Sequence, residues 1–81
     1  MTVLEEINKI IKEDYPQIKQ KITPSTKLKD VKELDSLELA IIIIKLETIF
    51  DITIDDNKIL ALQTKTVQDL INEFEIAIKA K

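Results

Sequence analysis

The sequence predicts an all-α fold, a four-helix bundle with a long first loop and a short third helix. Apolar residues recur at spacings of three and four near both ends of the chain, which is the period of an amphipathic helix. No segment has the partner that a β-strand would need, so helices must bury one another's apolar faces. With 81 residues, of which 44% are apolar and 33% charged, we expect residues 1–81 to form one globular domain.

The first helix is predicted between Thr2 and about Tyr15. Thr2 and Glu5 have the spacing of a capping box, in which each side chain binds the backbone N–H of the other residue. The helix should end near Tyr15 because the residue before a proline, here Pro16, is pushed out of the helical region. Its buried face should contain Leu4, Ile7 and Ile11.

A long loop, residues 15–34, should follow. Pro16 and Pro24 interrupt the helical pattern, and such a long stretch without regular structure is uncommon in a compact domain and often functional. We expect apolar side chains to pin it to the core, with one or two short helical turns within it. The candidate anchors are Ile18, Ile22, Leu28, Val31 and Leu34.

The second helix is predicted at Ser36–Phe50. The run Leu39–Ile44 also suits a strand, since isoleucine favours strands. However, the apolar pattern continues to Phe50 without a turn signal, and about fifteen residues exceed a typical strand. Asp35 can cap the helix, with Glu38 three residues later. The predicted buried face comprises Leu39, Ile42, Ile43, Leu46, Ile49 and Phe50.

Two further helices complete the bundle. Asp55 can cap a short helix over residues 56–62, and Thr66 with Asp69 can cap the last one. On the last helix, the residues expected in the core are Leu70, Ile71 and Phe74.

The absent residue types exclude several classes of chemistry. Without cysteine there is no disulfide and no thiol nucleophile, and without histidine there is neither an imidazole base nor an imidazole metal ligand. Without glycine there is no glycine-rich phosphate loop, and without arginine there is no bidentate recognition of phosphate or guanine. A net charge of −3 and a pI near 4.9 argue against a nucleic-acid partner.

The apolar runs and the charges also bear on location and partners. The longest apolar run, Leu39–Ile44, is far shorter than the roughly 20 residues of a membrane span, so we expect no membrane insertion. Glu5 and Glu6 stand where a signal peptide has basic residues, which favours a cytoplasmic location. Residues 30–56 carry eight acids and only two lysines, so they form either an acidic field that steers a basic partner or an ordinary solvated surface.

Ser36 is the candidate site for covalent chemistry. The other serine, Ser25, lies in a Pro-Ser-Thr turn, whereas Ser36 follows an acid at a helix start, where an attached phosphate is favoured. The alternative is that Ser36 only caps the helix. As a catalytic nucleophile it has no histidine to take its proton, and nothing indicates the desolvated lysine that would replace one. We therefore expect a protein that is not an enzyme.

The segment Asp35-Ser36-Leu37, followed by Leu46-Glu47 and Phe50-Asp51, resembles the motif of the acyl carrier protein family. Segments 54–56 and 66–69 fit the later part of the family pattern, so the likeness covers nearly the whole chain. Glu33 stands in place of the family's glycine and Asp55 in place of a frequent proline, and the overall charge is mild for the family. These departures favour a specialised member.

The resemblance implies a function. In this family a separate phosphopantetheinyl transferase attaches 4′-phosphopantetheine, taken from coenzyme A, to the motif serine, here Ser36. The thiol of that arm carries acyl groups as thioesters to the loading and using enzymes of fatty-acid, lipid or specialised-metabolite synthesis. Asp35 would help to hold a metal ion only in the modifying complex, and Leu37 completes the motif. The alternatives are a carrier of aminoacyl groups, D-alanyl or peptidyl, and a helical interaction domain without a prosthetic group.

A second apolar stripe on the predicted helix 36–50 is the candidate docking surface for partner enzymes. On a helical wheel Leu37, Ile41 and Ile44 lie opposite the buried face, and Glu38 and Glu47 lie at the borders. We expect this stripe to be exposed and the protein to be a monomer; the alternatives are a stripe covered by the loop or by a second copy. From the resemblance we also expect space for an acyl chain between the second and third helices.

Overall fold

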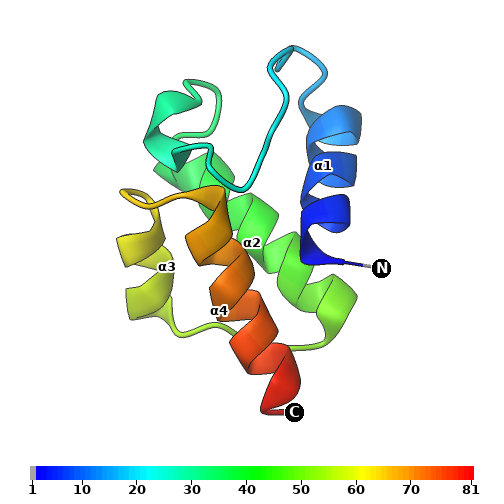
Figure 1. The fold of residues 1–81 in the computed structure, drawn as a ribbon, viewed down its shortest axis with the longest axis vertical. Coiled ribbons are helices and arrows are strands. Elements are labelled where there is room, and N and C mark those ends of the chain that lie inside the picture. The colour runs from blue at the N-terminus through cyan, green and yellow to red at the C-terminus, as the bar shows by residue number, and fades with distance from the viewer. Residues whose placement is uncertain (1) are drawn as a thin grey trace.

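A computed structural model describes residues 2–81 and shows an all-helical domain with four α-helices. No strand occurs within these residues. The helices begin where the sequence predicts, and a short 3₁₀ helix, η1, lies in the long loop (Figure 1). The elements are α1 (Val3–Asp14), η1 (Leu28–Asp30), α2 (Ser36–Phe50), α3 (Asp56–Leu62) and α4 (Val67–Lys79).

Helix α2 crosses the middle of the bundle, with α1 on one side and α3 on the other (Figure 1). Helix α1 contacts both α2 and α4, and α3 contacts α2. Where α2 ends, the ring of Phe50 meets the ring of Phe74 from α4 edge to face, with the ring centroids 6.4 Å apart. This geometry suits the positive edge of one ring and the negative face of the other.

All the predicted helix caps form, although the capping box at α2 is incomplete. Thr2 and Glu5 exchange hydrogen bonds of 3.1 and 2.8 Å, and Thr66 forms the same capping box at the start of α4. At α2 only half of the box is present. The Asp35 carboxylate accepts the N–H of Glu38 at 2.9 Å, but the Glu38 carboxylate accepts the hydroxyl of Tyr15 instead of returning to the helix start.

The core is close to the predicted one but differs at its edges. Leu4 and Phe50 are only half-buried, although both pack against the core. The prediction was wrong for Ile49, whose side chain is 38% exposed. It lies in the last turn of α2, at the border of the buried face, beside a shallow groove that α1 covers incompletely. The predicted residues that are buried are Ile7, Ile11, Leu39, Ile42, Ile43, Leu46, Leu70, Ile71 and Phe74.

The long loop packs onto the core through all five predicted anchors. Its later part is fixed to the start of α4 by three backbone hydrogen bonds. They run from Leu28 N–H to the Lys65 carbonyl at 3.0 Å, from Val67 N–H to the Thr26 carbonyl at 2.9 Å and from Gln68 N–H to the Pro24 carbonyl at 2.8 Å. Buried side chains and paired backbone groups together hold this segment in place, with η1 as its only helical turn of regular structure within the described residues.

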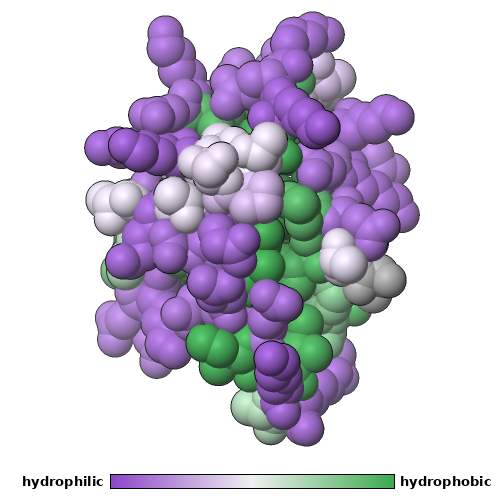
Figure 2. All heavy atoms as spheres, in the orientation of Figure 1, coloured by the Kyte–Doolittle hydropathy of each residue, from purple (hydrophilic) through white to green (hydrophobic). Residues whose placement is uncertain are grey.

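Hydrophilic side chains cover most of the face seen in Figure 2. Apolar side chains appear mainly in the lower half of this view, beside α4. Within residues 2–81, every helix is too short or too polar to cross a membrane.

Candidate functional site

Ser36 is the first residue of α2, and its side chain is exposed to solvent. Two buried neighbours, Leu34 before it and Leu39 after it, hold the inner side of this segment against the core. Between those two inward side chains, Asp35, Ser36 and Leu37 face outward. Asp35 and Leu37 are accordingly exposed as well, so the structure brings the three motif residues together at the surface.

Asp35 organises the start of α2. Its backbone is extended (φ −71°, ψ −177°), which is the usual conformation of a capping residue. Its Oδ1 atom accepts the N–H of Glu38, satisfying one of the amides that a helix start leaves without a partner. No cluster of three or more acidic side chains that could hold a metal ion occurs in the described part of the chain, so Asp35 has no such companions here.

Tyr15 is a residue of the site that the sequence reasoning missed. It ends α1, its side chain is buried, and its hydroxyl donates a hydrogen bond to the carboxylate of Glu38. Burial, and next this hydrogen bond, raise the pKa of Tyr15 to about 12. A tyrosine at the end of an amphipathic helix was the available signal, because a buried tyrosine hydroxyl usually finds a partner. The contact ties the end of α1 to the first turn of the helix that carries Ser36.

A surface groove of about 300 Å³ lies beside Ser36; we call it the serine groove. Its walls come from η1, the segment after it, the first turns of α2 and Gln63 at the end of α3. Four of its apolar residues also line an enclosed cavity inside the bundle. These shared residues are Leu28, Val31, Leu34 and Leu39.

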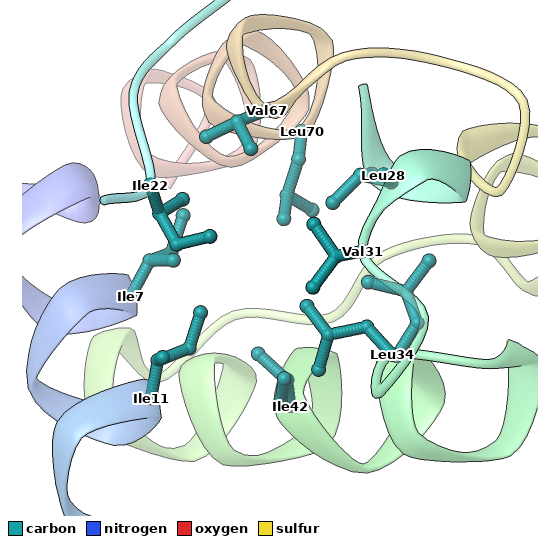
Figure 3. A pocket seen from close by; sticks show the side chains of 10 residues that line it. Ile7, Ile11, Ile22, Leu28, Val31, Leu34, Ile42, Val67 and Leu70 are labelled. Atoms are coloured by element: carbon teal, nitrogen blue, oxygen red, sulfur yellow. The ribbon is translucent and has the colours of Figure 1, made fainter. Parts of the chain in front are cut away.

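The enclosed cavity is entirely apolar and small. Figure 3 shows its lining side chains converging from α1, the loop, α2 and α4, among them Ile11, Ile22 and Leu70. Its volume of about 10 Å³ is close to that of a single water-sized sphere. Helix α3 contributes no side chain to this cavity, so the space expected between α2 and α3 stays a prediction.

The outer stripe of α2, defined as Leu37, Ile41 and Ile44, is exposed as predicted. The exposed fractions are 67%, 36% and 57%, and the long loop packs on the core rather than over the stripe. The two acids predicted at its borders are half-buried and engaged within the chain. Glu38 accepts the Tyr15 hydroxyl, and Glu47 accepts the N–H of Ile54 at 2.6 Å. These carboxylates therefore also hold α2 to its neighbours.

Comparisons of the chain with models of protein families, with curated proteins and with solved structures gave no match.

Proposed function

We propose that this protein is a specialised acyl carrier protein with 4′-phosphopantetheine attached to Ser36. The observation that carries the proposal is the exposed Ser36 hydroxyl, which stands at the first residue of a 15-residue helix between Asp35 and Leu37. The all-helical fold, with a long anchored loop before this helix and a short third helix after it, supports the same function.

The residues around Ser36 fit such a group. The hydroxyl is accessible to a modifying enzyme, and the serine groove beside it has room for part of a flexible arm. The arm would supply the thiol that the chain lacks, and with it the thioester chemistry. The chain itself would present the arm to its partners, namely the transferase and the acyl-loading and acyl-using enzymes.

The test is an intact-mass measurement after incubation with coenzyme A and a broad-specificity phosphopantetheinyl transferase. We expect the mass of one phosphopantetheinyl group to be added to the wild type and to Ser25→Ala, but not to Ser36→Ala. If the wild type is unmodified, the domain is a helical interaction module without this prosthetic group. If Ser36→Ala is modified as fast as the wild type, the attachment site is wrong.

We further propose that partner enzymes dock on the outer stripe. It begins beside Ser36, where any enzyme that acts on the arm must approach, and three exposed aliphatic side chains on one helix face are typical of an interface. The test compares Ile41→Glu with Ile76→Glu, which places the same charge at an exposed position of α4.

Both variants should keep the wild-type urea midpoint. Only Ile41→Glu should change the rate at which the transferase modifies Ser36. Equal rates for the two variants would contradict docking on the stripe, and loss of folding in Ile41→Glu would place Ile41 in the core.

The acyl chain, in this proposal, enters the bundle by widening the enclosed cavity. The four side chains shared by the serine groove and the cavity form the wall between the arm and the interior. Because burying each CH₂ group is favourable by about 0.8 kcal/mol, a medium-length chain on the arm should raise the melting temperature above that of the unacylated protein. Equal melting temperatures would show that the cargo stays outside.

A further inference from the structure

In segment 29–33, the two lysines line the serine groove and the two acids do not. Lys29 and Lys32 line the groove, whereas Asp30 and Glu33 do not. Lys29 lies in η1, and Lys32 lies in the turn that follows it. The one acid in the lining is Asp35, whose carboxylate is already engaged with the Glu38 N–H.

Neither lysine forms an ion pair within the described residues, although Asp35 also lines the groove. The ion pairs formed within residues 2–81 use Lys45, Lys58 and Lys81, and none involves Lys29 or Lys32. The groove therefore combines two unpaired ammonium groups with an apolar floor made by Leu28, Val31, Leu34 and Leu39. This combination suits a small anion joined to an apolar segment, because lysine binds phosphate oxygens as a point charge.

We propose that Lys29 and Lys32 hold the phosphodiester of the arm and keep the first part of the arm in the serine groove. This inference rests on the proposed attachment to Ser36, which also lines the groove and so fixes the phosphodiester there. Covalent attachment gives the anion a high effective concentration, so two exposed lysines suffice without a tight binding site. They are positioning residues and take no part in thioester chemistry.

The experiment compares melting temperatures of unmodified and modified protein, with intact mass confirming modification of Ser36. In the wild type, modification should raise the melting temperature by on the order of a few °C, as two exposed charge interactions in a small domain allow. The rise should shrink at high salt. It should disappear in the double variant Lys29→Gln/Lys32→Gln and persist in Lys29→Arg/Lys32→Arg.

A matched control is Lys19→Gln/Lys21→Gln, which removes the same charge from exposed loop positions outside the groove. It should retain the wild-type rise. An equal rise in both Gln double variants, or no rise in modified wild type, would overturn the inference while the carrier function stands. A wild type that gains no mass would overturn both.

A measurement with inorganic phosphate distinguishes a groove that holds the phosphodiester of the attached arm from one that binds free anions. Added to unmodified protein, inorganic phosphate should leave the melting temperature unchanged, because the groove lacks the affinity to bind an anion that is not tethered. A rise that depends on Lys29 and Lys32 would instead make the groove a site for free anions and refute its assignment to the arm.

Discussion

Raising the pH should destabilise this protein through Tyr15. The buried hydroxyl donates to Glu38, and the pKa of Tyr15 is raised from 10.0 to about 12, first by burial and then by that hydrogen bond. Below pH 10 both the folded and the unfolded chain keep the proton. Between pH 10 and 12 the unfolded chain releases it first, so the free energy of unfolding falls as the pH rises.

The magnitude follows from the size of the shift. Each pKa unit corresponds to about 1.4 kcal/mol, so the loss between pH 10 and 12 is on the order of 2–3 kcal/mol. A domain of this size has about 4–12 kcal/mol of stability in total. The variant Tyr15→Phe provides the reference, because it differs from the wild type only in the phenolic hydroxyl.

At neutral pH the wild type should be more stable than Tyr15→Phe by about 1.5–3 kcal/mol, the usual net value of a hydrogen bond to a charged group. Between pH 10 and 12 most of this difference should be lost. The assay is urea unfolding of both proteins at a series of pH values, followed by circular dichroism. Parallel stability curves would refute the reasoning.

The same titration can be observed directly, because Tyr15 is the only tyrosine in the chain. Its phenolate absorbance should appear with a midpoint near 12 in the folded protein and near 10 in urea. In Glu38→Gln the midpoint should fall but stay above 10, since burial is the larger cause. A folded-state midpoint near 10 would show that the hydroxyl is solvated.

Two further variants test the packing and the backbone. Leu46→Ala, at a fully buried position, should lower the free energy of unfolding by about 2–5 kcal/mol and leave the protein partly unfolded at room temperature. The control Ile44→Ala, at an exposed position, should change the urea midpoint little. Equal urea midpoints for the two variants would show that the faces of α2 are assigned wrongly. Asp51, at the end of α2, has a left-handed backbone (φ 55°, ψ 52°), which glycine adopts without a steric cost. Asp51→Gly should therefore stabilise the fold by about 1 kcal/mol, and Asp51→Ala should not. A urea midpoint of Asp51→Gly below that of the wild type would contradict this.

The helices were predictable because their signals are local. Period, caps and the proline after Tyr15 act within one or two turns, and all four α-helices begin where these signals place them. The loop anchors were also predictable, because burying large aliphatic side chains in the core removes their apolar surface from water.

The contacts between distant segments were not predictable in the same way. The Tyr15–Glu38 hydrogen bond joins residues 23 apart, and the Glu47 contact with Ile54 depends on how the chain leaves α2. Helical periodicity assigns a face to Ile49 but does not say how far the neighbouring helix extends over it. The serine groove is likewise a product of packing, since it combines loop, helix and Gln63 at the end of α3.

Helix α2 supplies both buried core side chains and an exposed apolar surface. One face supplies fully buried side chains, including Ile43 and Leu46, and the opposite face leaves Leu37 and Ile44 largely exposed. A helix that is apolar on both sides lacks the polar face that normally fixes its orientation in a bundle. In this chain the orientation is fixed by hydrogen bonds at both ends, from Tyr15 to Glu38 and from Ile54 to Glu47. Those contacts allow the outer face to stay apolar next to Ser36, which is what the proposed docking of partner enzymes requires.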